Sequence, residues 1–317
     1  MLKRDWHGKP YYSLDAYCKN TFHHKCYKLA LNAHLSCPNR DGTLGTDGCI
    51  FCSRGGSGDF AVDIRGKSIT EQIREARSLF GNKKTGEQYI AYFQAYTNTY
   101  GPVSYLNQIF RQALDEPCIV GISIATRPDC LPEEVLNLLS DLQKFYPSKF
   151  IWLELGLQTV HEGTAAFIRR GYPLSCFEDA MAALHSRGFP VIVHLILGLP
   201  GESRDMLLET IAYINRWHPF GVKLQLLHVL KDTDLATLYE QGLFSLPDKD
   251  TYLDMVTDCL AHLSPDIVVH RVTGDGPKSL LIAPLYSGNK RDMLNSLHGL
   301  MRSRGICQGM KYNRKDI

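Results

Sequence analysis

The sequence has no long apolar run. Its 317 residues are 44% hydrophobic and 21% charged, but no stretch approaches the roughly 18 consecutive apolar residues that a membrane-spanning helix requires. The first eight residues lack the apolar segment of a secretory signal. Linkers, low-complexity runs and internal repeats are also missing. We therefore expect a globular cytoplasmic protein with no membrane partner.

A second group of closely spaced cysteines is missing as well. The chain has ten cysteines, and without an export signal we expect free thiols rather than disulfides. Only Cys37, Cys49 and Cys52 lie close together, in a glycine-rich loop that can turn tightly. His34 would complete a four-ligand Cys3His zinc site. The alternative is a [4Fe–4S] cluster held by three cysteines, with one iron left for another ligand. The spacing alone leaves both open.

Apolar strand patterns alternate with helical patterns along the chain. The predicted strands are 26–35, 89–94, 118–126, 150–158, 190–197 and 222–230, and the predicted helices between them are 69–80, 103–114, 132–144, 161–187 with a break near 171–173, and 203–217. Strands buried on both faces, joined by helices, predict a parallel sheet with right-handed crossovers. Six units predict a partial (β/α)6 TIM-like barrel of the α/β class, with a doubly wound sheet as the alternative.

Residues 25–265 form the predicted core, with two short extensions. The N-terminal extension, residues 1–24, is aromatic enough to pack on the core. Helices are expected from about residue 231 and over 248–262. The C-terminal extension, residues 266–317, contains a short strand at 266–272 and a helix over about 289–304.

Polar motifs follow the predicted strands at the points where they end. Cys37 follows the first strand, Gln94 the second and Thr126 the third, while Glu154 to Gln158 lie on the fourth and Gly198 follows the fifth. In both α/β architectures ligands bind at the carboxyl ends of the strands. We therefore expect these motifs to form one shared site.

Taken together, the motifs resemble those of the radical SAM superfamily. The resemblance rests on segments 37–52, 94–100, 124–129, 154–159, 194–202 and 270–277. The eleven residues between Cys37 and Cys49 replace the three that are usual in the superfamily. A long first loop is similar to that of the Elongator catalytic subunit branch, and the chain resembles the YhcC/YtqA-type bacterial proteins almost from end to end.

The resemblance implies a cofactor pair. Cys37, Cys49 and Cys52 would hold three irons of a [4Fe–4S] cluster, and the fourth iron would bind the amino and carboxylate groups of S-adenosylmethionine. Reduction would cleave S-adenosylmethionine to methionine and a 5′-deoxyadenosyl radical, while the protein orients and shields the cofactors. His34 then becomes a strand residue that faces the core or the site instead of a ligand.

The resemblance also implies the residues that would contact S-adenosylmethionine. Phe51 would lie beside the adenine, and Glu154 would accept hydrogen bonds from the ribose. Arg170, with Arg169 as the alternative, would pair with the methionyl carboxylate. The remaining candidates are Gln94, Tyr96, Thr97 and Asn98 in the amino-group motif, Thr126 after the third strand, Gln158 at the ribose, and His194 and Gly198 near the adenine.

Charge is uneven along a chain whose net charge is +2. Residues 1–40 carry seven Lys/Arg and two Asp/Glu, and residues 266–317 carry nine and four, so the middle of the chain is acidic. Basic ends could bind an anionic partner such as RNA, or they could be solvated termini with no partner. The Elongator resemblance implies modification of a tRNA wobble uridine, with an electron donor such as flavodoxin or ferredoxin. A small metabolite or peptide substrate, and a non-catalytic Fe–S or zinc RNA-binding protein, are the alternatives.

Overall fold

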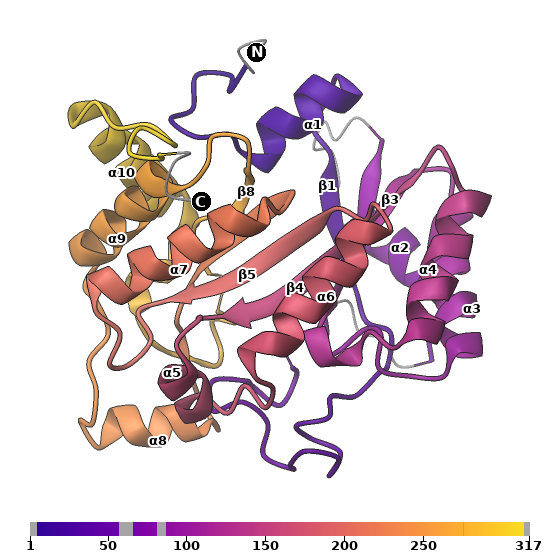
Figure 1. The fold of residues 1–317 in the computed structure, drawn as a ribbon, viewed down its shortest axis with the longest axis horizontal. Coiled ribbons are helices and arrows are strands. Elements are labelled where there is room, and N and C mark those ends of the chain that lie inside the picture. Colours follow the sequence, from indigo (N-terminus) through magenta and orange to yellow (C-terminus); the bar gives the residue numbers. More distant parts are fainter. Residues whose placement is uncertain (1–4, 57–65, 81–86, 275, 314–317) are drawn as a thin grey trace.

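Seven parallel strands form one curved sheet in the computed structural model, which describes residues 5–56, 66–80, 87–274 and 276–313 (Figure 1). In spatial order the strands are β1 (Tyr27–Leu31), β2 (Tyr89–Phe93), β3 (Ile119–Thr126), β4 (Phe150–Gln158), β5 (Val191–Leu197), β6 (Gly221–Leu226) and β8 (Val268–Arg271). The sheet is a partial barrel that runs from β1 at one edge to β8 at the other. The predicted α/β fold is confirmed, and a seventh strand extends it.

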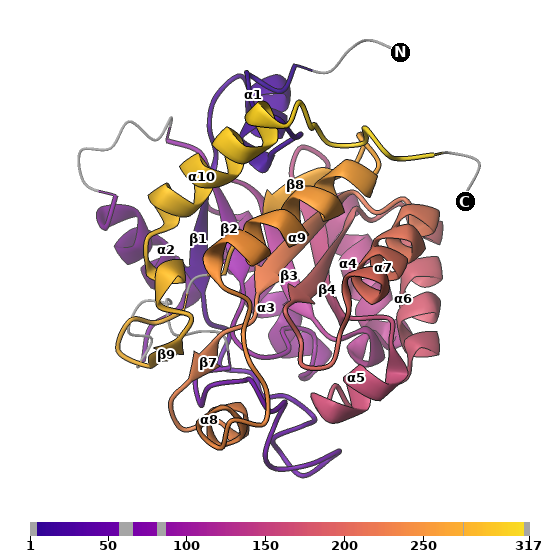
Figure 2. The ribbon, with the colours of Figure 1, turned by 90° about the vertical axis from the view of Figure 1, so that its left-hand side faces the viewer.

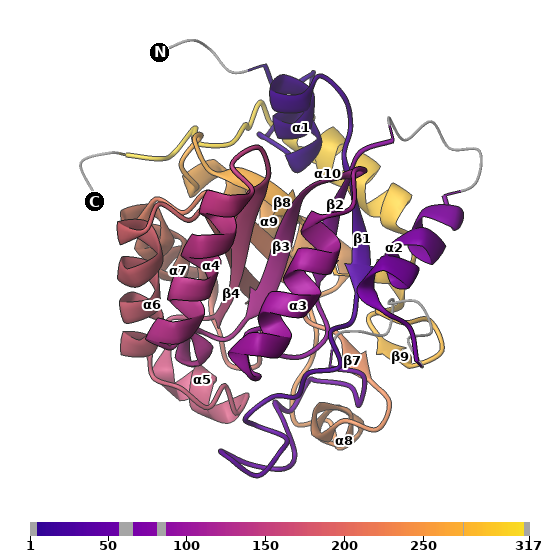
Figure 3. The same ribbon diagram turned by 90° about the vertical axis from the view of Figure 1, so that its right-hand side faces the viewer.

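Helices cover the outer face of this sheet, as Figures 2 and 3 show from two sides. They are α2 (Ile69–Ser78), α3 (Val103–Leu114), α4 (Glu133–Phe145), α6 (Leu174–Ser186), α7 (Arg204–Trp217) and α9 (Lys249–His262), with the short α5 (Glu162–Phe167) before α6. Alternate strand residues such as Leu29 and Leu31 point outward into the apolar core that these helices share. The residues between them point to the inner side of the sheet.

The first strand is shorter than predicted. Ser68 and Glu71 form a capping box, worth about 1 kcal/mol, that starts α2. This helix places Gln72 beside Asn32, whose backbone N–H and carbonyl both bond to the Gln72 amide (2.9 and 3.0 Å). The side chain thus ends β1 at Leu31. His34, expected to face the core or the site, is instead exposed in a left-handed turn (φ 54°), so that expectation was wrong.

The last predicted core strand is divided. Strand β6 ends at Leu226, and β7 (Val229–Leu230) pairs antiparallel with β9 (Leu281–Ala283) in a separate sheet. Strand β8, from the predicted C-terminal extension, takes the place beside β6. The division of the chain at residues 24 and 265 stays a prediction, but the main sheet continues beyond the second boundary.

The two ends of the barrel differ. Helix α1 (Leu14–Phe22) lies where the strands begin, and Tyr17 packs its ring against Phe220 and Trp152. The loop of residues 37–52 and α8 (Asp234–Glu240) lie at the opposite end, while the described parts of both termini lie near α1 (Figure 1). The remaining elements are η1 (Pro128–Cys130), η2 (Leu285–Gly288) and α10 (Lys290–Ser303). No helix in the described ranges is long and apolar enough to cross a membrane.

Candidate active site

A cavity of about 550 Å³ lies on the inner side of the sheet. It extends from Leu14 of α1 to the loop of residues 37–52, which we call the cysteine loop, and Cys37, Cys49 and Cys52 all line it. The strands contribute their inward residues to its wall. The cysteine loop therefore faces the same cavity as the polar motifs at the strand ends.

Arg40 holds the cysteine loop together. Its backbone N–H donates to the Cys37 carbonyl (2.8 Å), and its guanidinium donates to the carbonyls of Cys52 and Ser53 (2.9 and 2.8 Å). Gly48 has φ of 76°, and a Cβ there would lie 2.9 Å from Arg40 Nε. Only glycine fits this turn without displacing the arginine. These contacts bring the first and last cysteines of the loop to one cavity.

The three thiols are free and half-buried. Hydrogen bonding with Cys52 lowers the pKa of Cys49 to about 7 against the effect of burial, and the same contact raises the pKa of Cys52. Across the described parts of the chain, no three His, Cys, Asp or Glu side chains gather closely enough to hold one metal ion.

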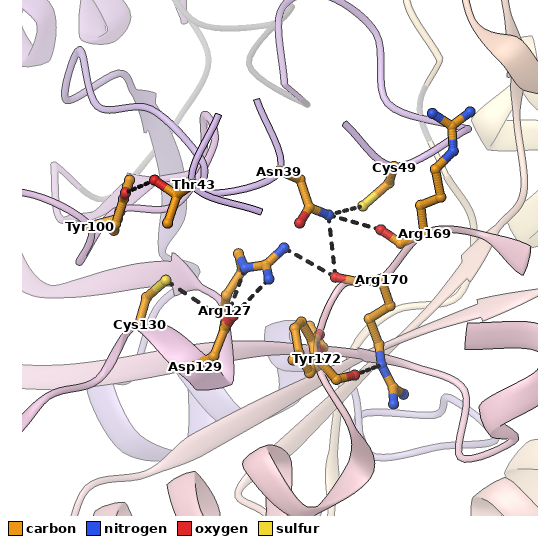
Figure 4. A network of polar contacts seen from close by, with 11 residues as sticks. Asn39, Thr43, Cys49, Tyr100, Arg127, Asp129, Cys130, Arg169, Arg170 and Tyr172 are labelled. Atoms are coloured by element: carbon orange, nitrogen blue, oxygen red, sulfur yellow. Dashed lines mark hydrogen bonds and ion pairs between the residues drawn. The ribbon is translucent and has the colours of Figure 1, made fainter. Parts of the chain in front are cut away.

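Asn39 ties the cysteine loop to the segment after α5. Its Nδ2 donates to Cys49 Sγ (3.5 Å) and to the carbonyls of Arg169 and Arg170 (2.8 and 3.3 Å) (Figure 4). Arg127 donates to the same Arg170 carbonyl (3.1 Å) and also lines the cavity. Asn39 therefore links Cys49 to the segment after α5, which Arg127 also contacts.

Arg170 was predicted to pair with a methionyl carboxylate, but its guanidinium is already paired within the protein. The side chain is 2% exposed. Its Nε donates to the Tyr172 carbonyl, Nη1 to the carbonyls of Leu157 and Thr159, and Nη2 to the Glu162 carboxylate, at 2.7–3.3 Å. All three nitrogens are used, so this geometry gives Arg170 a supporting role and no free donor for a ligand.

The motif after β2 is only partly in the cavity. Gln94, Tyr96 and Thr97 line it, and Tyr96 has a left-handed backbone (φ 58°). Asn98 is fully buried outside the lining, where its Nδ2 donates to one backbone carbonyl of β2 and one of β3 (3.2 and 2.9 Å). Asn98 therefore joins two strands, and its predicted contact with a ligand has no support.

Two glutamines present unpaired polar atoms in the lining. Gln94 Nε2 and Gln158 Oε1 are buried and have no hydrogen-bond partner among the described residues. Gln158 also has φ of 66°, a conformation that is uncommon outside glycine. An unsatisfied buried amide costs about 1–3 kcal/mol. A polar ligand that satisfied both atoms would recover part of that cost.

Glu154 lies at the centre of a buried charged layer, which comprises Lys28, Glu154, His194 and Lys223. Its carboxylate is 0% exposed and bonds to Lys28 Nζ (2.5 Å), His194 Nε2 (2.6 Å) and Lys223 Nζ. Ser123 donates to it as well. Because four partners already occupy the two oxygens, the predicted contact between Glu154 and a ribose is not supported by this geometry.

Burial and mutual attraction set the charges in this layer. Burial opposes ionisation of Glu154, but Lys223 and Lys28 outweigh it and hold the pKa of the carboxyl well below its ordinary value. Burial lowers the pKa of both lysines in spite of Glu154. Burial, together with the charge of Lys223, lowers the pKa of His194 to about 4. The imidazole is therefore neutral at pH 7.

The remaining predicted residues are divided between the cavity and the surface. Phe51 and Thr126 line the cavity. Gly198 does not line it, because its backbone faces Pro247 in a left-handed turn (φ 84°). Arg169 is 38% exposed and pairs with Asp234 at the surface.

Sequence reasoning missed several lining residues, including Lys28 and Lys223. A signal for these two was present. Each lysine occupies the middle of a strand whose neighbours, such as Leu29 and Leu224, are apolar, and the strand period of two separates the two kinds of residue. A lysine in that position indicates an inner face that is polar.

Two family models match the chain. The model of the radical SAM superfamily matches residues 38–214, and the radical SAM C-terminal domain matches residues 219–303. The first covers more than half of the chain. This protein belongs to the radical SAM superfamily.

Relatives of nearly the same length support the assignment. YtqA of Bacillus subtilis is 42% identical over 306 residues, covering 96% of this chain and 94% of YtqA. YhcC of Escherichia coli is 36% identical over 290 residues, covering 92% and 91%. The solved structure of the Methanocaldococcus infernus Elp3 superposes with a TM-score of 0.67 at 16% identity, covering 89% of this chain and 64% of that one. This last likeness concerns the fold.

The chain is thus a radical SAM enzyme, and its family implies a [4Fe–4S] cluster and S-adenosylmethionine. The residues of the cavity fit both groups. Three free thiols line one wall, and soft thiolates are the ligands that iron–sulfur clusters take. The unpaired amides of Gln94 and Gln158 match the hydroxyl, amino and carboxylate groups that S-adenosylmethionine presents.

Proposed function

We propose that this enzyme holds a [4Fe–4S] cluster through Cys37, Cys49 and Cys52 and cleaves S-adenosylmethionine reductively to a 5′-deoxyadenosyl radical. The observation that carries the proposal is the convergence of three free thiols and two unpaired glutamine amides on one cavity. The bound cluster would supply the electron for cleavage. A flavodoxin or ferredoxin of the cytoplasm would deliver it.

The residues of the chain have definite parts in this proposal. Cys49 binds iron as a thiolate, as Cys37 and Cys52 do. Asn39 donates to its sulfur, and such hydrogen bonds tune cluster potentials. Gln94 and Gln158 orient S-adenosylmethionine through the polar atoms that lack partners. Phe51 forms an apolar part of the wall beside the cysteines.

The proposal is tested by reconstituting the protein anaerobically with iron and sulfide, adding dithionite and S-adenosylmethionine, and measuring 5′-deoxyadenosine. The wild type should produce it and Cys49→Ala should not. Cys307→Ala is the matched control, because Cys307 is an exposed cysteine outside the cavity, and it should behave as the wild type. Equal background levels in all three proteins would refute the proposal. Stoichiometric zinc in protein purified without oxygen would instead support the structural zinc alternative.

For the substrate we propose a tRNA base, with wobble uridine as the first to be tested. The sequence motifs resemble those of the Elongator branch, and that resemblance is the support. The described residues nearest the two termini lie near α1 (Figure 1). At the other end of the cavity Arg54 and Lys278 are exposed next to lining residues, and we expect RNA to reach the cavity there.

Salt-dependent binding tests this part separately. Unmodified tRNA should bind with an affinity that falls steeply between 50 and 200 mM salt, as expected for phosphate contacts. Arg54→Gln should reduce the salt dependence, whereas Lys144→Gln, at an exposed site on α4, should not. Absence of tRNA binding at 50 mM salt would refute the RNA substrate and favour a small metabolite, the candidate that the buried charged layer supports.

A further inference from the structure

The charged layer contains two lysines and one acid. Lys28 and Lys223 both direct their side-chain nitrogens at the single carboxylate of Glu154, which is the only acid among the described residues that line the cavity. Burial lowers the pKa of both lysines. An anion bound beside them would favour their ammonium forms.

Both lysines retain the capacity to bind one more partner. Lys223 Nζ contacts Glu154 and donates to the Tyr92 hydroxyl (2.9 Å), and Lys28 Nζ contacts Glu154 and lies 3.4 Å from Ser123 Oγ. An ammonium has three donors. Each lysine can therefore place one further N–H toward an oxyanion while it keeps the contacts observed here.

His270 adds an unused polar group to the same region. It lines the cavity, and both of its ring nitrogens are buried without a hydrogen-bond partner among the described residues. Burial and the charge of Lys28 hold its pKa well below the ordinary value, so the neutral ring retains one N–H donor. The motif at 270–277, whose residue 275 lies outside the described residues, thereby contributes to the charged end of the cavity.

Space for a ligand lies directly above this layer. The inward positions that follow along β1, β3 and β4 are Ala30, Ala125 and Gly156, and all three line the cavity. Ala30 and Ala125 have small side chains that leave room on their strands. The Gln158 amide folds back over Gly156, where a Cβ would lie 2.7 Å from Gln158 Nε2. This predicted cofactor contact therefore lies over the inward position next to Glu154.

We propose that Lys28, Lys223 and His270 form a subsite for a carboxylate or phosphate group of the substrate, which enters with its anionic end toward α1. This assignment rests on the proposed function, since it takes the cavity to be the active site. Glu154 is a positioning residue that holds the two ammonium groups toward the ligand. This subsite favours the small-metabolite alternative over a tRNA base, and the substrate class that follows is a compact anionic small molecule.

Calorimetric titration of the reconstituted protein in the presence of S-adenosylmethionine tests the subsite. The probes are inorganic phosphate and succinate, which separate a phosphate from a carboxylate preference. At least one probe should bind saturably at one site per chain. Lys223→Gln should weaken that binding about tenfold, as expected when a charge-assisted hydrogen bond is lost. Lys249→Gln, which removes an exposed lysine paired with Asp292, should leave it unchanged.

A further variant keeps the test decisive. Lys28→Gln should weaken binding as Lys223→Gln does, so the test survives if one of them fails to fold. No saturable binding of either probe, or equal binding by Lys223→Gln and Lys249→Gln, would overturn the inference. If tRNA displaced both probes at low salt, the subsite would be assigned to an RNA phosphate, and the small-molecule assignment would be overturned. If the wild type formed no 5′-deoxyadenosine, that result would count against the proposed function and not against the subsite.

Discussion

Replacement of Glu154 by glutamine should destabilise this protein far more than loss of a surface carboxylate. The side chain of Glu154 is 0% exposed, and those of its partners Lys223 and Lys28 are 4% and 17% exposed. Glutamine preserves the shape but leaves two buried ammonium groups without a counter-charge. Removing one partner from a buried ion pair costs about 3–5 kcal/mol. We expect a loss of that size in the free energy of unfolding at pH 7.

Urea denaturation followed by tryptophan fluorescence provides the assay, because the buried Trp152 ring lies 5.9 Å from Lys28 Nζ. Asp254→Asn is the matched control, since it breaks an exposed pair with Arg304 that is worth about 0–1 kcal/mol. The double variant Glu154→Gln/Lys223→Gln should recover part of the stability, because it restores the charge balance. A Glu154→Gln loss no larger than that of Asp254→Asn would refute the electrostatic reasoning.

Three further predictions follow from the site. The pKa of His194 is lowered to about 4 in the native state. Between about pH 6.5 and 4, His194 is therefore protonated in the unfolded chain and neutral in the native state. Stability should therefore fall by up to roughly 3 kcal/mol as the pH falls through this window, and denaturation of His194→Gln should lack this component; an unchanged pH profile would contradict it. Gln158→Ala should weaken S-adenosylmethionine binding by about 3–10-fold, the effect of one hydrogen bond, without loss of iron. Gln108→Ala, at an exposed site on α3 outside the cavity, should bind normally, and equal affinities in equilibrium dialysis would exclude Gln158 as a contact. Asn39→Ala removes the donor to Cys49 Sγ and should make the cluster potential more negative by about 20–60 mV; redox titration that gives the wild-type value would refute this role.

Much of the architecture was predictable because periodicity and turn residues determine it locally. Helix α3 and strand β4 begin and end where the sequence pattern placed them. The errors arose from distant contacts. The Gln72 amide, forty residues away, ends β1 at Leu31, and β8 takes its place in the sheet through pairing with β6. Neither event leaves a local signal.

The candidate site divides in the same way. The shared position of Cys37, Gln94 and Gln158 followed from the rule that parallel strands end at one edge. The partners of individual charged groups could not be predicted in this way, because those partners lie on distant segments of the chain. The Arg170 guanidinium donates to backbone carbonyls and to Glu162. Glu154 pairs with two lysines that lie within predicted strands.

In the proposed site three cysteines hold a cluster with one iron open to S-adenosylmethionine. Electron–nuclear double resonance of the reduced, reconstituted protein with S-adenosylmethionine labelled with ¹⁵N at its amino group tests this arrangement. Coupling between the cluster and the labelled nitrogen is expected in the wild type and in Cys307→Ala, and none in Cys49→Ala. A reduced cluster in the wild type that shows no coupling to the label at saturating S-adenosylmethionine would contradict it.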